Sequence, residues 1–146
     1  MTYSTHKLKQ EDLSSFVDLW NQDPEALATS KRVMTLDLAQ DGFKENYFDY
    51  YFGLYENNKL IGFILIKNID DNIWLKHMLI DNGERGKGLG KMFLSEVLKI
   101  VNNRILTEVV EDNDRAKKFY IDNGFREIRF DQESRDYILE YIPSLI

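Results

Sequence analysis

A glycine-rich, basic segment near the middle of the chain has the residue types of a phosphate-binding turn. It consists of Arg85, Gly86, Lys87, Gly88, Leu89, Gly90 and Lys91. Glycine permits backbone conformations with positive φ, which let successive N–H groups point into one concavity. An apolar helical repeat follows, and a helix N-terminus adds about half a positive charge. We therefore expect this segment to bind a phosphate at the start of a helix.

Two better known phosphate loops differ from this segment in their spacing. A P-loop needs glycine where Arg85 stands and a hydroxyl residue where Met92 stands. A dinucleotide-binding turn that starts at Gly86 needs glycine at position 91, where lysine stands, and it needs a strand that opens a βαβ unit. A glycine-rich turn that merely starts a helix stays open as an alternative on the glycines alone.

A second segment reads as one well-capped helix. Asn113 is a suitable N-cap, and Gly124 is a suitable residue just after the last turn, before a strand. Ala116, Phe119 and Tyr120 fall on one face of this helix. Considered by itself, the pattern favours Tyr120 as a core aromatic residue.

The elements that position these segments follow one another closely. Residues with high β-propensity predict strands over Tyr3–Leu8, Tyr50–Tyr55, Leu60–Lys67, Ile73–Ile80, Arg104–Val110, Phe125–Phe130 and Tyr137–Ile142. Apolar residues at helical spacing predict helices over Glu11–Trp20, between Leu36 and Phe48, and over Gly88–Val101 and Asp114–Asn123. The order is β-α-α-β-β-β-α-β-α-β-β. Three of these strands form an antiparallel meander with turns at Asn57-Asn58 and Asp70-Asp71-Asn72.

Length and composition predict one soluble α/β domain over residues 1–146, with 43% hydrophobic and 13% aromatic residues. The sequence has no cysteine, which excludes disulfides, thiolate metal sites and cysteine nucleophiles and favours a cytoplasmic protein. No apolar run approaches the roughly 20 residues that span a bilayer, so membrane insertion is not expected. The net charge of −6 argues against nucleic acid as a partner and weakly favours a cationic substrate, although solubility alone also explains it.

Together the two segments resemble the GCN5-related N-acetyltransferase (GNAT) superfamily. Its signature is Arg/Gln-x-x-Gly-x-Gly/Ala at the helix after the fourth strand, and later Asn-x-x-Ala-x-x-Phe-Tyr-x-x-x-Gly-Phe. The matching residues are Arg85, Gly88, Gly90, Asn113, Ala116, Phe119, Tyr120, Gly124 and Phe125. The order of elements matches as well. The resemblance implies a mixed α+β fold whose mostly antiparallel sheet has six or seven strands and four flanking helices.

The resemblance also implies that the co-substrate is acetyl-CoA and that no metal is needed. The main-chain amides from Gly86 to Lys91 would hold the pyrophosphate. Main-chain groups of Met78 and Ile80 would pair with the pantetheine arm like an added strand, and Asn113 would contact the same arm. The acetyl group would lie between the splayed ends of the fourth and fifth strands, where an amine attacks it directly.

The family role of Tyr120 is to protonate the departing CoA thiolate. The ordinary pKa of a thiol is about 8.5 and that of tyrosine about 10, so full proton transfer is uphill by roughly 2 kcal/mol. We therefore expect Tyr120 to act mainly as a hydrogen-bond donor to the charge that develops on sulfur.

The base that deprotonates the amine is not named by the sequence. Relatives commonly place a base, or a water held by one, on the fourth strand, where this chain has Trp74, Lys76 and His77. Alternation predicts Trp74 and Lys76 on one face of the strand and His77 on the other. His77 is a candidate base, or else a packed histidine. Glu108 and Glu111 are further candidates, and a water chain fits equally well.

The leading hypothesis is an N-acetyltransferase that acts on a primary amine of a small molecule. A peptide or protein acceptor is an alternative, and an acyl-CoA-binding module without catalysis is a third. Homodimerisation is left open. The aromatic residues of a region that lines the acceptor site in relatives are Tyr47, Phe48, Tyr50, Tyr51, Phe52 and Tyr55. Alternation sends Phe52 and Leu54 to one face and Tyr51 and Tyr55 to the other.

Overall fold

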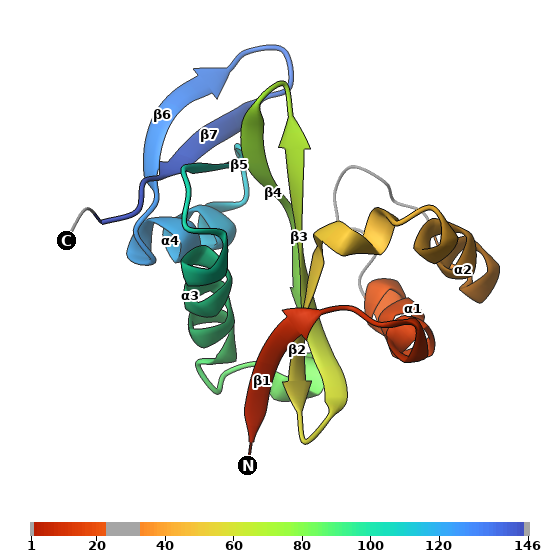
Figure 1. The fold of residues 1–146 in the computed structure, drawn as a ribbon. Coiled ribbons are helices and arrows are strands. Elements are labelled where there is room, and N and C mark those ends of the chain that lie inside the picture. The colour runs from red at the N-terminus through yellow and green to blue at the C-terminus, as the bar shows by residue number, and fades with distance from the viewer. Residues whose placement is uncertain (1, 23–32, 145–146) are drawn as a thin grey trace.

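Seven strands form one sheet in the computed structural model, which describes residues 2–22 and 33–144 (Figure 1). The strands are β1 (Tyr3–Lys7), β2 (Tyr51–Glu56), β3 (Lys59–Ile69), β4 (Asn72–Ile80), β5 (Ile105–Val110), β6 (Arg126–Asp131) and β7 (Asp136–Tyr141). The α-helices are α1 (Leu13–Gln22), α2 (Leu36–Lys44), α3 (Leu89–Val101) and α4 (Asp114–Asp122). This is the mixed α+β fold expected from the sequence. The second strand begins at Tyr51, because Tyr47–Tyr50 forms a 3₁₀ turn (η3).

The two turns of the predicted meander are confirmed. Asn57 and Asn58 join β2 to β3, while Asp70 and Asp71 join β3 to β4, and all four residues have positive φ. A tight hairpin turn needs positive φ at both central residues, and Asn and Asp tolerate it better than most side chains. These local signals align β2, β3 and β4 as an antiparallel sheet.

The sheet opens between β4 and β5, its one parallel pair. The order is β1-β2-β3-β4-β5-β7-β6, and every other neighbouring pair is antiparallel. The parallel register begins at Ile73 opposite Ile105 and ends at Leu75 opposite Thr107. Both strands then continue to Ile80 and Val110 without further pairing to each other. The backbone edges that face this opening are therefore available to another group.

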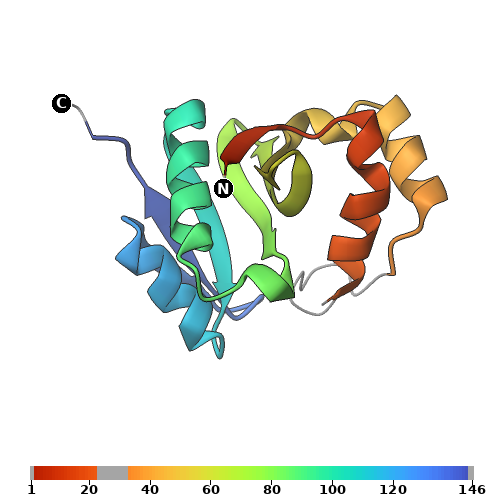
Figure 2. The ribbon, with the colours of Figure 1, turned by 90° about the horizontal axis from the view of Figure 1, so that it is seen from below.

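Helices cover both faces of the sheet (Figure 2), with α3 and α4 on one side and α1 and α2 on the other. On α3, an apolar stripe that includes Phe93, Leu94 and Val97 is fully buried against the sheet. Phe16 and Trp20 of α1 pack on the opposite face with other buried aromatic residues. Burying each large side chain contributes about 1.5–3 kcal/mol. None of the helices in the described ranges is long and apolar enough to cross a membrane.

A β-bulge interrupts β4 just where the sheet opens. His77 lies opposite Leu65, but Leu75 lies opposite the next residue, Ile66, so Lys76 is an extra residue in β4. Such a bulge changes which side chains point to which face, because strands alternate strictly only while their register is regular.

The bulge makes the predicted alternation along β4 wrong. Leu75 and Met78 both pack in the core on the α3 side, although they are three positions apart. Trp74 alternates with Leu75 and therefore faces α1. His77 also lies on that side, where its ring contacts Trp20 of α1 with the ring centroids 5.4 Å apart. His77 and Trp74 thus share a face, contrary to the sequence-based expectation.

Candidate active site

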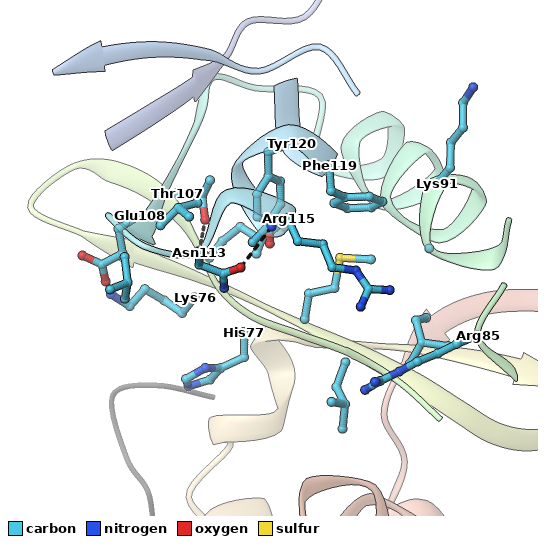
Figure 3. A pocket seen from close by; sticks show the side chains of 18 of the residues that line it. Lys76, His77, Arg85, Lys91, Thr107, Glu108, Asn113, Arg115, Phe119 and Tyr120 are labelled. Atoms are coloured by element: carbon cyan, nitrogen blue, oxygen red, sulfur yellow. Dashed lines mark hydrogen bonds and ion pairs between the residues drawn. The ribbon is translucent and has the colours of Figure 1, made fainter. Parts of the chain in front are cut away.

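A cavity of about 770 Å³ occupies the opening between β4 and β5 (Figure 3). Its walls are the diverging halves of the two strands, the glycine-rich turn, the start of α3 and one side of α4. The cavity therefore joins the two segments singled out in the sequence, which are far apart along the chain.

The glycine-rich turn forms an open cradle at the start of α3. Gly86 and Gly88 have φ values of 84° and 74°, and no atom lies within 4 Å of where a Cβ would stand on either residue. Gly88 is the N-cap of α3, and no side chain caps this helix. The first N–H groups of a helix have no acceptor within the helix, so those that follow Gly88 are free to bind an anion. These features fit a phosphate.

Basic side chains surround the cradle. Arg85, Lys91 and Arg115 line the cavity (Figure 3), and within the described residues none of the three has an ion-pair partner. Lys87 differs, because its side chain pairs with Glu84 at 2.9 Å and lies outside the lining. The main-chain amide of Lys87 stays a predicted phosphate donor. The positive side chains at the cavity thus come from the turn, α3 and α4.

The start of α4 forms the wall opposite β4. Asn113 caps the helix, since its side-chain oxygen accepts a hydrogen bond from the N–H of Ala116 at 3.1 Å. The ring of Phe119 lies 3.5 Å from where a Cβ on Gly90 would stand, and the methyl group of Met78 lies 3.7 Å from the same point. Both are ordinary contact distances, so the first turn of α3 and the Phe119 side chain of α4 lie next to each other beside the cavity.

Tyr120 of α4 lies at the cavity, at the point where the strands part. Its ring packs edge-on against Phe119 and Phe125, with ring centroids 5.5 and 5.3 Å away. Burial raises the pKa of Tyr120 to about 12, and the neighbouring Thr107 side chain opposes this rise. The buried Thr107 hydroxyl donates its proton to the carbonyl of Leu75 at 2.9 Å, across the last residue pair of β4 and β5. Tyr120 is thus an unionised phenol at neutral pH.

The far end of the cavity holds the candidate bases. Lys76 and Glu108 form an ion pair of 2.5 Å across the opening, and the Lys76 ammonium lies 5.6 Å from the centre of the Trp74 ring. Burial lowers the pKa of His77 to about 4, and the positive charge of Lys76 adds to this effect. Glu111 lies outside the lining and pairs with Arg135. His77 is therefore neutral at pH 7, and the Glu108 carboxylate is already paired.

The cavity collects nearly all of the predicted site residues. Those that line it are His77, Met78, Ile80, Arg85, Gly86, Gly88, Leu89, Gly90, Lys91, Asn113 and Tyr120. Sequence reasoning missed Thr107 and Arg115. Arg115 lies inside the second motif, two positions after the N-cap, and this place beside a predicted cofactor residue could have indicated that it lines the site. No local signal marked Thr107, because its contacts with Leu75 and Tyr120 are long-range.

The aromatic region of the predicted acceptor site divides as alternation predicts. Phe52 and Leu54 pack on the α3 side, and Tyr51 and Tyr55 on the α1 side. Tyr55 is buried, and its hydroxyl donates to Asp12 at 2.6 Å. The other two tyrosines, at positions 47 and 50, are 59% and 50% exposed. The side chain of Phe48 lies outside the part of the chain that the structure describes.

The opened sheet, with a glycine-rich helix start in the opening, is the arrangement that the resemblance to acetyltransferases implies. The pattern of the Acetyltransferase (GNAT) family matches residues 6–125. Because this match spans most of the chain, the chain belongs to that family. No curated protein matches the sequence significantly.

Solved structures support the same fold. The chain is similar to the PaiA N-acetyltransferase of Thermoplasma acidophilum in complex with coenzyme A, with a TM-score of 0.75, 21% identity and coverage of 98% of this chain and 100% of that one. The ribosomal-protein-alanine N-acetyltransferase of Brucella melitensis has a TM-score of 0.80 at 13% identity, with coverage of 96% of this chain and 99% of that one. An acetyltransferase of Thermus thermophilus has a TM-score of 0.77 at 19% identity, with coverage of 96% of each chain. At such low identities these likenesses establish the fold.

Proposed function

We propose that the protein is an acetyl-CoA-dependent N-acetyltransferase that transfers the acetyl group to a primary amine of a small molecule by direct attack in a ternary complex. One observation carries this proposal. A single cavity runs from the uncapped N-terminus of α3, between the parted strands, to the hydroxyl of Tyr120. It offers a phosphate-type cradle at one end and a proton donor further along.

The cavity fits coenzyme A at three places. The amides from Gly86 to Lys91 and the dipole of α3 suit the pyrophosphate. Met78 and Ile80 pair with β3 along one edge of β4, so their other edge faces the opening and suits a pantetheine arm that binds like a strand. Asn113, at the start of α4, lines the same passage.

Tyr120 would stabilise the leaving group. Acetyl-CoA, when bound, supplies an acetyl group activated as a thioester. With a pKa of about 12, the Tyr120 hydroxyl keeps its proton and can point it at the sulfur. Full transfer of that proton to a thiolate with a pKa of about 8.5 would be uphill by about 5 kcal/mol. Tyr120 would thus act chiefly as a hydrogen-bond donor, with proton transfer to sulfur completed from solvent.

The acceptor amine must lose a proton before or during its attack. An alkylammonium group has a pKa of about 10.4, far above that of His77, so proton transfer to His77 is strongly uphill. The Glu108 carboxylate is already held in an ion pair by Lys76. His77 and Glu108 would therefore serve as relay points in a water chain that carries the proton out of the cavity.

A small cationic amine agrees with the net charge of −6, because such a protein attracts cations. Among structures of similar fold are a ribosomal-protein-alanine N-acetyltransferase and one described as a putative phosphinothricin N-acetyltransferase. These names place both protein and small-molecule acceptors within one fold. The test should therefore cover both kinds of acceptor.

The decisive experiment measures thiol release from acetyl-CoA across a panel of polyamines, amino acids, aminoglycosides and short peptides. Mass spectrometry of the purified protein would identify any CoA that copurifies. We expect turnover with at least one small amine and an acetylated product heavier by one acetyl group. Turnover only with peptides would contradict the proposed acceptor class, and CoA binding without turnover on the whole panel would favour a non-catalytic binding module. Failure to bind CoA would overturn the proposal.

A further inference from the structure

We propose that Arg115 binds a phosphate group of the co-substrate and closes the phosphate cradle from α4, on the wall opposite Arg85. This inference rests on the proposed function, since it concerns the same ligand. Sequence reasoning gave Arg115 no role, and the glycine-rich turn is complete without it. The residue would thus be a second and separate source of phosphate affinity.

The position of Arg115 is set by the capped start of α4. Asn113 fixes the first turn through its hydrogen bond to the N–H of Ala116, and Phe119 packs beside Gly90. Arg115 follows the N-cap by two positions, so its Cα is held by a well-defined turn. Figure 3 shows its side chain reaching from α4 into the cavity, as Arg85 does from the turn. The two guanidinium groups therefore approach the cavity from different elements.

Arg115 differs from the neighbouring basic residues of α4 in its ion pairing. Its neighbours Lys117 and Lys118 have carboxylate partners, Glu127 at 2.7 Å and Asp122 at 2.6 Å. Arg115 follows acidic residues at positions 111, 112 and 114, yet within the described residues it forms an ion pair with none of them. An arginine without a carboxylate partner, in a chain of net charge −6, is available to an anionic ligand.

Arginine suits this role better than a lysine would. Its planar guanidinium group donates two parallel hydrogen bonds to a phosphate, whereas Lys91 offers a point charge. Arg85 and Arg115 belong to the turn and to α4, so a phosphate held by both would also tie these two parts of the chain together. Coenzyme A offers a pyrophosphate and a 3′-phosphate with the same chemistry.

Binding measurements test the inference without depending on catalysis. Isothermal titration would give the Kd of CoA and of 3′-dephospho-CoA for the wild type, Arg115→Ala, Arg115→Lys and the control Lys118→Ala. Lys118 lies on the same helix, is exposed and carries the same charge, but it does not line the cavity. We expect Arg115→Ala to weaken CoA binding at least tenfold, Arg115→Lys to give an intermediate loss, and Lys118→Ala to change the Kd less than twofold.

The two ligands identify the phosphate. A loss for CoA but not for 3′-dephospho-CoA assigns Arg115 to the 3′-phosphate, and equal losses assign it to the pyrophosphate; both results support the inference. A change of less than twofold in Arg115→Ala overturns it, as does an equal loss in Lys118→Ala, which would reflect general electrostatics. Thermal unfolding of each variant verifies folding. If the wild type fails to bind CoA, the proposed function fails instead.

Discussion

Tyr120 is held in the cavity by contacts that its own motif supplies. Phe119 precedes it on α4, Phe125 begins the next segment, and both rings meet the tyrosine ring edge-on. From elsewhere in the chain, the Thr107 side chain lies close enough to oppose the rise of the Tyr120 pKa, and the ring packs against the core of the sheet. Packing therefore sets the direction of the phenol.

The Tyr120→Phe variant isolates that proton. Because the ring contacts remain, we expect CoA affinity to change less than about twofold, while turnover falls at least about tenfold through the loss of one donor to the sulfur. Steady-state kinetics and a CoA titration would measure the two effects. Tyr3→Phe on β1, outside the cavity lining, is the matched control. Unchanged turnover in Tyr120→Phe would rule out the catalytic role.

His77 should make the protein less stable in mild acid. Burial, with Lys76 nearby, lowers its pKa from 6.5 to about 4 in the folded state. Between these values the unfolded chain binds a proton that the folded chain does not, so stability falls as pH falls from 6.5 towards 4. We expect His77→Gln to lose about 2 kcal/mol less than the wild type between pH 7 and 4.5 in urea unfolding. An imidazole NMR titration with a midpoint near 6.5 would contradict this account.

At the scale of elements, the turn before α3 depends on glycine at specific positions. Gly88 has positive φ, which an L-residue adopts at a cost of about 1–2 kcal/mol. Gly90 lies in the first turn of α3 without positive φ, and a Cβ there would meet Phe119 at an ordinary contact distance. The backbone conformation therefore favours glycine at position 88 but not at position 90, although the two residues are close in sequence.

Alanine substitutions at the two positions should therefore have different effects on stability. We expect Gly88→Ala to lower the free energy of unfolding by about 1–2 kcal/mol, because its φ must stay positive or the turn must change. Gly90→Ala should leave stability equal or slightly higher, since alanine favours a helix by up to about 1 kcal/mol over glycine. Chemical unfolding of both variants measures the difference. Equal losses in both would show that the turn is not strained at Gly88.

Three local features mark the point where β4 and β5 separate. The bulge at Lys76 turns the second half of β4 away from the regular register. Thr107 bonds to the carbonyl of Leu75 at the last paired position, so the strands are fastened where they begin to part. Just beyond, the ion pair between Lys76 and Glu108 spans the opening. These contacts lie where the paired part of the two strands ends and the cavity begins.

Across the whole molecule, charge is distributed unevenly. The chain carries a net charge of −6, yet Arg85, Lys91 and Arg115 line the cavity near the glycine-rich turn, where the lining carboxylate of Glu84 is paired with Lys87. Salt screens charges beyond about 10 Å at 0.1 M, so distant acidic residues contribute little at that ionic strength, while the cations beside a bound phosphate still contribute. The local positive charge should therefore control the binding of an anion.

Raising the salt concentration should consequently weaken the binding of CoA. Between 0.1 and 0.5 M NaCl we expect the Kd to rise about three- to tenfold, because the screening length shrinks to a few ångströms. Isothermal titration at both concentrations gives the answer, and thermal unfolding verifies that the fold is unchanged. A Kd that is constant or falls with salt would mean that the acidic surface, rather than the cavity, dominates the interaction.

The sequence by itself determined the features that depend on neighbouring residues. Positive φ at Gly86 and Gly88, the Asn113 cap and the two Asn and Asp hairpins follow from residue type and local spacing. The seven strands and four helices could be placed to within a few residues for the same reason. The motif around Tyr120 was recognisable because its members lie on one helix.

Only the tertiary structure decided which side chains meet in the cavity. Because of the bulge in β4, His77 lies on the same face as Trp74, although alternation had predicted opposite faces. The Lys87 side chain pairs with Glu84, whereas Arg115 lines the cavity. Thr107 contacts Leu75 on the neighbouring strand and Tyr120 on α4. Each outcome depends on strand register or on packing between elements far apart in the chain. Such contacts compete in free energy only once the whole sheet is assembled, so no local spacing predicts them.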